Sequence, residues 1–378
     1  MHKEQYDVIV VGAGPAGSAA SFSCAKANLR TLLIESQPLP QEKLCAGGVN
    51  PWVIQELGIP ERLIERTIQQ VQVVAGSKKI PTIPWPSEMA YRMAMRKDLS
   101  HFLADRASKM GVTVIDSRRV LSVLKLRDGT ICGVKTSGGD INAKIVIGCD
   151  GASSTVARTS GLWEKWWGPK VLSGWLRHQA FCLETQMHMD PKIIEKRVGN
   201  TMTLFFEKEF PGYCWIFPKR RVLTVGVLSL SSSVNKEELR GQLEKLVHIH
   251  TLASELLKGG QMEPIRGAYL PIRGPLTPSY DDGLMLAGDS AAHVGAIWGE
   301  GIYFAVKAGI AAGETAVQAI HNGDVSRESL KIYEERWKME IGENLETQSK
   351  ILNDAPTPLQ ATIAFAEYIV KNKSKLYL

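Results

Sequence analysis

A glycine-rich turn near the N-terminus constrains this fold more than any other feature of the sequence. An apolar run at residues 6–11 leads into Gly-Ala-Gly-Pro-Ala-Gly at 12–17, and small residues continue in a helical pattern to Lys26. A second apolar run, residues 30–34, is followed by Glu35. This order is typical of a βαβ unit that binds a dinucleotide, because the glycines allow a tight turn and bring backbone N–H groups close to a pyrophosphate.

The spacing of the turn assigns expected roles to individual residues. We expect the pyrophosphate to approach the backbone at Gly12, Gly14, Ala16 and Gly17, with the last glycine also permitting close packing of the helix. Glu35 ends the second strand, where it can accept hydrogen bonds from an adenosine ribose. A purely structural glycine turn is the alternative, but the strand, helix and terminal acid in register favour the nucleotide site.

Further apolar segments predict the rest of the fold. Strand patterns occur at 112–115, 132–136, 145–149 and 284–287, and helical patterns at 96–110 and 301–320. We predict an α/β protein in which a Rossmann-type nucleotide domain (1–60, 92–162 and 275–325) interlocks with a mixed α+β substrate domain. That second domain (61–91 and 163–274) is rich in aromatics and in strand patterns, so we expect an antiparallel sheet in it. Residues 326–378 form a charged helical region, which Pro356 and Pro358 are expected to break.

Composition and charge exclude several functions. The net charge of +6 arises from 45 basic and 39 acidic residues scattered along the chain, which is not the pattern of a nucleic-acid-binding protein. The chain lacks the uninterrupted run of about 20 apolar residues that crosses a bilayer. Its six cysteines form no Cys-x-x-Cys pair, so no metal site is predicted. We expect a cytoplasmic protein, and peripheral contact with the inner membrane face is a hypothesis.

A second strand-then-acid arrangement lies at residues 284–289, far from the first turn. The segment 288–293, Gly-Asp-Ser-Ala-Ala-His, resembles the second FAD fingerprint of the flavoprotein hydroxylase superfamily, in which the aspartate binds the ribityl chain. A Gly-x-Gly then opens a helix whose N-terminus faces the flavin. Asp150-Gly151 and Arg96 match two further motifs of that superfamily. The resemblance implies FAD contacts at Cys45, Ala46, Gly47, Arg96, Val120, Asp150, Gly151, Gly288, Asp289, Gly299, Gly301 and Ile302. A helix N-cap for Asp289 and a solvated side chain for Arg96 are the alternatives.

Two further motifs narrow the resemblance. Residues 45–48 read Cys-x-Gly-Gly, and residues 213–218 read Tyr-x-Trp-x-Phe-Pro. Together with Gly-Glu-Gly-Ile at 299–302, they are similar to the geranylgeranyl reductase family, over a stretch from the N-terminus to about residue 320. The resemblance implies an FAD-dependent reductase that saturates double bonds of a prenyl chain in a lipid precursor, a prenyl diphosphate or a prenylated quinone.

The implied reaction delivers a hydride from flavin N5 to one alkene carbon and a proton to the other. In a strand, Tyr213, Trp215 and Phe217 project from one face and offer an apolar surface to a prenyl chain, with Trp298 as a further substrate contact. We predict catalytic roles for Cys45, Tyr213 and Trp215. The proton donor stays open between Cys45, Tyr213 and an ordered water, and packing in a sheet core remains the alternative for the aromatics.

Several residues near these motifs have competing interpretations. His293 is expected to be a hydrogen-bonded structural histidine, and Tyr91, Arg92 and Lys219 either meet a substrate head group or are solvated. The family's Asn-Pro before Gly-Glu-Gly-Ile is absent, since Gly-Ala-Ile-Trp occupies residues 295–298. We expect this loss to loosen the loop and to affect the substrate more than the cofactor.

Rival functions and partners remain open at this point. One rival is a monooxygenase or halogenase of the same fold, whose Trp-x-Trp-x-Ile-Pro signature is close to residues 213–218, and another is a non-catalytic flavin-bearing lipid carrier. The electron donor is NADPH, NADH or ferredoxin. The tryptophans of residues 163–175, interleaved with basic residues, resemble a membrane-interface anchor in composition, with a buried core as the equal alternative. No nucleic-acid partner is expected.

Overall fold

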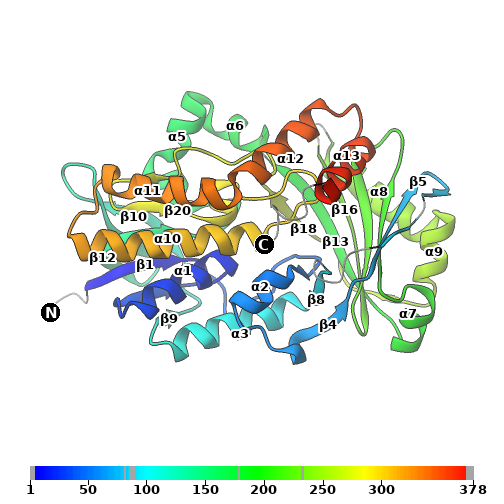
Figure 1. The fold of residues 1–378 in the computed structure, drawn as a ribbon, viewed down its shortest axis with the longest axis horizontal. Helices are drawn as coiled ribbons and strands as arrows, with labels where there is room; N and C mark the ends of the chain where they lie inside the picture. The colour runs from blue at the N-terminus through cyan, green and yellow to red at the C-terminus, as the bar shows by residue number, and fades with distance from the viewer. Residues whose placement is uncertain (1–4, 81, 85–89, 178, 231–233, 372–378) are drawn as a thin grey trace. The chain divides into compact units, whose positions relative to one another are not determined.

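The computed structural model describes residues 5–80, 82–84, 90–177, 179–230 and 234–371 (Figure 1). The chain forms two compact units, each assembled from three separate segments. Unit 1 comprises residues 1–41, 100–178 and 271–349, and unit 2 comprises residues 42–99, 179–270 and 350–378. The α/β class is confirmed. Segments 42–60, 92–99, 163–178 and 271–274 fall in the opposite unit from the one suggested by the sequence patterns.

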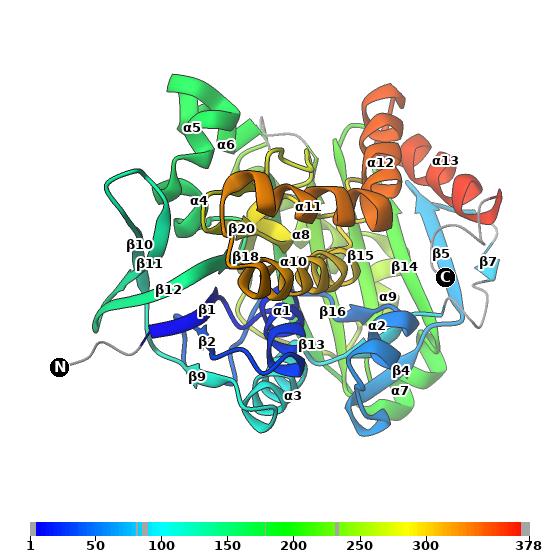
Figure 2. The same ribbon diagram turned by 60° about the vertical axis from the view of Figure 1, so that its left-hand side comes forward.

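Unit 1 is built on a mainly parallel sheet in the order β20-β12-β1-β2-β9. Its strands are β1 (Gln5–Val11), β2 (Thr31–Ile34), β9 (Thr113–Ile115), β12 (Gly139–Gly148) and β20 (Leu284–Leu286). Most of their aliphatic side chains are buried, as expected for a parallel sheet covered on both faces, while Val114 and Ile115 of the edge strand β9 are half-buried. The antiparallel strands β10 (Val120–Lys125) and β11 (Ile131–Thr136) extend the sheet beyond β12 (Figure 2).

Helices α1 (Pro15–Lys26) and α10 (Ile302–Asn322) lie side by side in unit 1 (Figure 1). Small residues allow this close approach. A Cβ atom at Gly309 would lie 2.3 Å from the backbone oxygen of Ala16, and one at Gly313 would lie 2.6 Å from that of Ala20. Gly309 and Gly313 of α10 therefore allow this helix to pack closely against α1.

The tryptophan-rich segment forms α5 (Leu162–Trp167) and α6 (Val171–Arg177). Trp163 is buried in the core of unit 1, and its ring lies 5.2 Å from that of Trp167 and 6.0 Å from that of Trp175. The indole N–H groups of Trp166 and Trp175 donate to the backbone oxygens of Pro278 and Ala152. These contacts favour the core interpretation of the tryptophans over the membrane-anchor hypothesis.

Unit 2 contains a larger sheet in the order β17-β13-β16-β15-β14-β5-β6, with β18 beside β13 and β7 beside β5. Its strands are β5 (Gln70–Ala75), β6 (Lys78–Lys79), β7 (Ile83–Pro84), β13 (Ala180–His188), β14 (Thr201–Phe206), β15 (Gly212–Pro218), β16 (Val222–Ser229), β17 (Gln261–Met262) and β18 (Arg266–Leu270). The central pairs are antiparallel, as predicted, while β14 and β5 are parallel.

Helices pack on this sheet where the sequence patterns indicated mainly strands. They are α7 (Pro191–Arg197), α8 (Lys236–His248) and α9 (Thr251–Leu257). The leucines of α8, at positions 239, 243 and 246, join the sheet core. A small sheet of β3 (Gly48–Val49), β8 (Arg92–Ala94) and β4 (Ile64–Thr67), the helix α2 (Pro51–Glu56) and the start of α3 (Arg96–Lys109) also belong to this unit.

The C-terminal region is helical, as predicted. It contains α11 (Arg327–Trp337), a π-turn at Lys338–Gly342, α12 (Glu343–Asp354) and α13 (Pro358–Lys371). The prediction that prolines break the helix holds after α12, but Pro358 opens α13, because proline is well accommodated in the first helical turn. None of the helices in the described ranges has the length and apolarity that a bilayer crossing requires.

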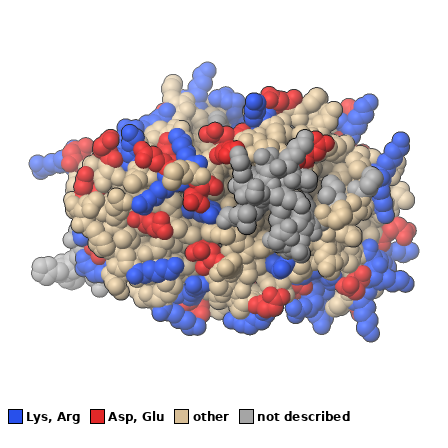
Figure 3. Space-filling view, in the orientation of Figure 1, with Lys and Arg blue, Asp and Glu red and all other residues tan. Residues whose placement is uncertain are grey.

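Positive and negative side chains are interspersed over the face of the molecule drawn in Figure 3. This distribution agrees with the scattered charges of the sequence.

Candidate active site

The N-terminal turn has a geometry that only glycine tolerates. Gly12 has φ +101°, and a Cβ atom there would lie 2.4 Å from the backbone oxygen of Cys149. A Cβ atom at Gly17 would lie 1.9 Å from the backbone oxygen of Gly12. Gly14 precedes α1, and among the described residues no side chain caps this helix N-terminus. Its first N–H groups are thus suited to binding phosphate oxygens.

Glu35 holds this turn in place. Its Oε2 atom accepts a hydrogen bond of 2.9 Å from the Ala13 N–H, and its Oε1 atom accepts bonds of 3.0 Å from the Ser36 hydroxyl and the Gln37 N–H. The carboxylate is buried. A carboxylate oxygen can accept two hydrogen bonds, so Oε2 can still accept one from a ribose. The predicted ribose contact is therefore compatible with this anchoring role, which the sequence did not indicate.

The second glycine motif adjoins the first within unit 1. Gly288 follows β20 with φ +72°, and a Cβ atom there would lie 3.0 Å from the Cβ atom of Ala16. Gly301 is the N-cap residue of α10, and a Cβ atom on it would lie 3.6 Å from Oδ1 of Asp289. The structure therefore brings Gly288, Asp289 and the start of α10 to the glycine turn, as the resemblance implies. Ile302 is the first residue of α10.

The loop before α10 is held by Gln348 of α12. The Ile297 N–H donates to Gln348 Oε1 over 3.3 Å, and Gln348 Nε2 donates to Asn344 Oδ1 over 2.8 Å. A Cβ atom at Gly295 would lie 2.7 Å from Gln348 Oε1. We expected the loss of the Asn-Pro pair to loosen this loop, but Gln348, about 50 residues later in the sequence, contacts the loop and holds it. Gly299 has φ +66°, and Trp298 beside it is half-buried.

Asp150 and Val120 have structural roles in unit 1. The Asp150 carboxylate accepts hydrogen bonds from the hydroxyl of Ser154, the N-cap of α4 (Thr155–Ser160), and from the N–H groups of Thr155 and Val156 in the first turn of this helix. Val120 is buried in the apolar core. Gly151 adopts φ +83° after the aspartate. The FAD contacts predicted for these residues remain predictions.

In unit 2, the Cys-x-Gly-Gly segment forms a tight loop, called the Cys45 loop here and comprising residues 43–48. Gly47 has φ +87°, and a Cβ atom on it would lie 2.2 Å from the backbone oxygen of Ala94. Its N–H donates to Cys45 Sγ over 3.4 Å. Cys45 and Ala46 are half-buried. The glycine requirement is thus explained by the fold itself, while the roles of Cys45 and Ala46 stay predictions.

The three aromatics of β15 lie on one face, as predicted. The ring centroids of Tyr213 and Trp215 are 6.2 Å apart, and those of Trp215 and Phe217 are 6.3 Å apart. We call these residues the aromatic row. Trp215 lies over Gly226 of the neighbouring strand, where a Cβ atom would be 2.1 Å from the ring. Gly226, which sequence reasoning missed, makes room for the tryptophan.

The burial of Tyr213 affects its suitability as the proton donor. Tyr213 and Trp215 are buried, while Phe217 is half-buried and packs with Tyr91 and Met202. Burial raises the pKa of the Tyr213 hydroxyl well above its ordinary value. A tyrosine of this kind keeps its proton at neutral pH, which makes it a weak acid for catalysis.

Three residues that could have been solvent-exposed side chains are buried. Lys219 is 1% exposed and donates to the Thr224 hydroxyl, Arg96 is buried at the start of α3, and Tyr91 is buried. Arg92 is half-buried and donates to the backbone oxygen of Ala90. The solvated alternative was therefore wrong for Lys219, Arg96 and Tyr91. Charged and polar side chains are mostly exposed in proteins, and the neighbouring sequence did not indicate that these three are buried.

His293 is a core residue, as expected, but it is not a hydrogen-bonded one among the described residues. The ring is fully buried, both nitrogens lack a partner there, and the ring centroid lies 4.6 Å from that of Trp337. Burial lowers the pKa of His293 to about 3, against an opposing effect of the Asp289 charge. The ring is therefore neutral at physiological pH.

The chain is similar to known FAD-dependent proteins over almost its whole length. A family model described as an FAD binding domain matches residues 5–347. A digeranylgeranylglycerophospholipid reductase of Methanocaldococcus jannaschii is 34% identical, with 88% of this chain and 82% of the relative aligned. The reductase of the same name from Methanococcus vannielii is 32% identical, with 89% and 83% aligned.

Solved structures agree with these matches. A geranylgeranyl bacteriochlorophyll reductase-like protein of Thermoplasma acidophilum superimposes with a TM-score of 0.80 and 25% identity, covering 99% of this chain and 98% of that one. A flavin-dependent brominase has a TM-score of 0.69 at 17% identity, covering 98% and 100%. The brominase indicates a shared fold. The glycine turns, uncapped helix starts and acids described above fit FAD.

Proposed function

Because the chain belongs to the geranylgeranyl reductase family of FAD-dependent oxidoreductases, we propose that it saturates isolated C=C bonds in a geranylgeranyl or longer polyprenyl chain. The proposed substrate is a membrane lipid precursor, a prenyl diphosphate or a prenylated quinone. The observation that carries the proposal is the aromatic row of Tyr213, Trp215 and Phe217, which occurs in the same unit as the Cys45 loop.

The residues proposed to hold FAD lie at two helix starts in unit 1. Gly12, Gly14 and Gly17 would admit the pyrophosphate, Glu35 would receive the adenosine ribose, and Asp289 would receive the ribityl chain. FAD bound there and reduced by two electrons would supply a hydride for the alkene. The N–H groups at the start of α10 would face negative charge on the cofactor, since a helix N-terminus favours an anion.

The aromatic row is proposed to position the prenyl chain. An isolated alkene develops no oxyanion that hydrogen-bond donors could stabilise, so orientation and exclusion of water must contribute most of the acceleration. The largely buried faces of these rings would contribute to both. Cys45 is proposed to touch the alkene as proton donor, since burial makes Tyr213 a poor acid.

A single-turnover experiment tests this function. The FAD-loaded protein is reduced with dithionite without oxygen and mixed with a geranylgeranyl glycerolipid. We expect the flavin spectrum to return to the oxidised form only with the lipid, and the product to gain two hydrogens per reduced bond by mass spectrometry. Reoxidation by oxygen alone, with the lipid unchanged, would instead support a monooxygenase, a halogenase or a non-catalytic carrier. Replacing dithionite by NADPH, NADH or reduced ferredoxin identifies the electron donor.

The proposed substrate also implies contact with a membrane surface, because prenyl lipids reside there. Flotation of the protein with anionic liposomes at low salt tests this point. Protein that stays at the bottom of the gradient would contradict peripheral binding.

A further inference from the structure

The central sheet of unit 2 contains two charged side chains that are almost completely buried. Glu184 on β13 is 3% exposed, and Lys219, directly after β15, is 1% exposed. Burying charges of this kind costs free energy, and apolar residues of similar size usually stabilise a fold as well or better. The pair therefore calls for an explanation other than stability.

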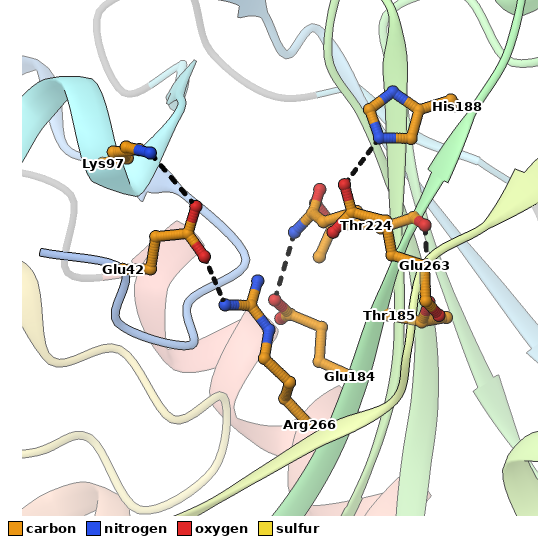
Figure 4. A network of polar contacts seen from close by, with 9 residues as sticks. Glu42, Lys97, Glu184, Thr185, His188, Thr224, Glu263 and Arg266 are labelled. Atoms are coloured by element: carbon orange, nitrogen blue, oxygen red, sulfur yellow. Dashed lines mark hydrogen bonds and ion pairs between the residues drawn. The ribbon is translucent and has the colours of Figure 1, made fainter.

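Two neutral side chains connect the charged ones. The Lys219 ammonium donates to the Thr224 hydroxyl, which donates to Gln186 Oε1 over 3.1 Å. Gln186 Nε2 in turn donates to Glu184 Oε1 over 3.3 Å. Figure 4 shows Glu184 beside Thr224 in this network. The result is a continuous chain of hydrogen bonds from the ammonium to the carboxyl group across β13 and β16.

Both ends of this chain reach the Cys45 loop. The Glu184 carboxyl group accepts a hydrogen bond from the backbone N–H of Cys45, and Lys219 interacts electrostatically with the Cys45 thiol. A Cβ atom at Gly47 would lie 2.9 Å from Cε and 3.3 Å from Nζ of Lys219. The buried pair thus lies next to the Cys45 loop.

The surroundings of Glu184 allow it to exchange a proton near neutral pH. Burial raises the pKa of Glu184 to about 7, opposed by Lys219, the Cys45 N–H, Arg266 and Gln186. Burial likewise lowers the pKa of Lys219. The other titratable groups that face this pair are Cys182, beside Glu184, and Glu65, beside Lys219.

A partly exposed ion-pair cluster lies next to Glu184. Arg266 Nη1 donates to Glu42 Oε2 over 2.9 Å, and Lys97 Nζ donates to Glu42 Oε1 over 3.4 Å (Figure 4). All three side chains are between about two-fifths and three-fifths exposed. They provide a polar connection from Glu184 towards solvent, from which a proton can be replaced.

We propose that Glu184 is a positioning residue that returns a proton to Cys45 after the thiol has protonated the alkene. This inference rests on the proposed function. The S–H bond of Cys45 breaks and a C–H bond forms at one alkene carbon, while the hydride supplied by that function reaches the other. The O–H bond of Glu184 then breaks, the thiol is restored, and the carboxylate is stabilised by Lys219 until water donates a proton to it.

The test compares two variants with a matched control. Glu184→Gln keeps the size and hydrogen bonding of the side chain but has no transferable proton. Lys219→Met removes the buried cation and is expected to move the titration of Glu184 to higher pH. Glu263→Gln is the control, since this carboxylate belongs to the same unit and bonds His188 Nε2 over 2.7 Å but is 40% exposed.

The first readout needs no substrate. The carboxyl stretching band of the FAD-loaded, oxidised protein is followed by infrared spectroscopy as a function of pH. We expect a band that titrates near neutral pH in the wild type and in Glu263→Gln, that is lost in Glu184→Gln, and that shifts to higher pH in Lys219→Met. Absence of such a band from the wild type would overturn the inference.

The second readout is the pH profile of repeated turnover with the geranylgeranyl lipid. In the wild type, kcat should decline above about pH 7 as Glu184 ionises. In Glu184→Gln it should be about 100-fold lower, a usual contribution of a placed proton donor, and should lack this decline. FAD content and the KM for the lipid should change little. Lys219→Met should move the decline to higher pH, and Glu263→Gln should match the wild type.

The outcomes separate this inference from the proposed function. A wild type that reduces the lipid, with a Glu184→Gln variant of equal kcat and pH profile, overturns the inference alone. A wild type that leaves the lipid unchanged overturns both. If Glu184→Gln does not fold or bind FAD, the shift expected in Lys219→Met decides the matter, and an unshifted profile there overturns the inference.

Discussion

Replacing His293 by leucine should remove an acid-dependent loss of stability. The imidazole is 0% exposed, and neither ring nitrogen has a partner in the part of the chain that the structure describes. Burial lowers its pKa from 6.5 to about 3, with the Asp289 charge acting in the opposite direction. The folded protein therefore excludes a proton that the unfolded chain binds below pH 6.5.

The size of the effect follows from this difference in pKa. A depressed folded-state pKa gives stability that is complete above the unfolded value and is lost as the pH falls towards the folded value. Each pH unit within that window corresponds to about 1.4 kcal/mol, so lowering the pH from 8 to 5.5 should cost the wild type about 1.4 kcal/mol through this residue. At the lower limit of the window, the cumulative cost would approach about 5 kcal/mol.

Urea unfolding of the FAD-saturated protein at several pH values between 8 and 5.5 measures this cost. The difference in unfolding free energy between the wild type and His293→Leu should change by about 1.4 kcal/mol across the range, in favour of the variant at low pH. His101→Leu is the control, because this histidine is exposed. A difference that stays constant with pH would refute the assignment of a neutral, buried imidazole.

Three further substitutions test the packing described above. Gly309→Ala should lower the unfolding free energy by about 1 to 3 kcal/mol in urea titrations, because its Cβ atom would meet the Ala16 oxygen at 2.3 Å, whereas Gly241→Ala on open helix surface should not. Gly226→Ala should displace the Trp215 ring, change tryptophan fluorescence and reduce prenyl turnover about tenfold with unchanged FAD content, as a misplaced positioning group does. Trp163→Ala should cost about 3 to 5 kcal/mol on thermal or urea unfolding and leave liposome flotation unchanged, since the ring is a core residue.

Local patterns were sufficient to predict the nucleotide-binding half of the fold. The first strand, the glycine turn and helix α1 follow one another within about two dozen residues, so their geometry depends on neighbours in the sequence. Helix α8 could also have been found, because Leu239, Leu243 and Leu246 recur at helical spacing. The parallel pairing of β5 with β14 could not, since these strands are separated by more than 100 residues.

The candidate site shows the same division. Glycines with special backbone angles and acids that end strands carry a local signal, and the sequence identified them. Gln348 and Glu184 do not, because the loop that each contacts lies in a distant segment of the chain. Glu184 and Gln186 lie two residues apart on β13, and polar residues at this spacing were the available signal for a hydrogen-bonded network on one face of the strand.

Glu35 has a structural role in addition to the cofactor contact that its motif predicts. Its position after the second strand indicates a ribose contact, yet its carboxylate also accepts the Ala13 N–H at 2.9 Å inside the glycine turn. A buried N–H without a partner costs about 1 to 3 kcal/mol, so the carboxylate stabilises the turn before any ligand arrives. We therefore expect the acid to act on cofactor affinity in two ways, through the predicted ribose contact and through the conformation of the backbone that is predicted to receive the pyrophosphate. Asp150 follows the same logic at the start of α4, where its carboxylate is occupied by backbone N–H groups. In this fold, acids of the nucleotide motifs first organise the loops that carry them.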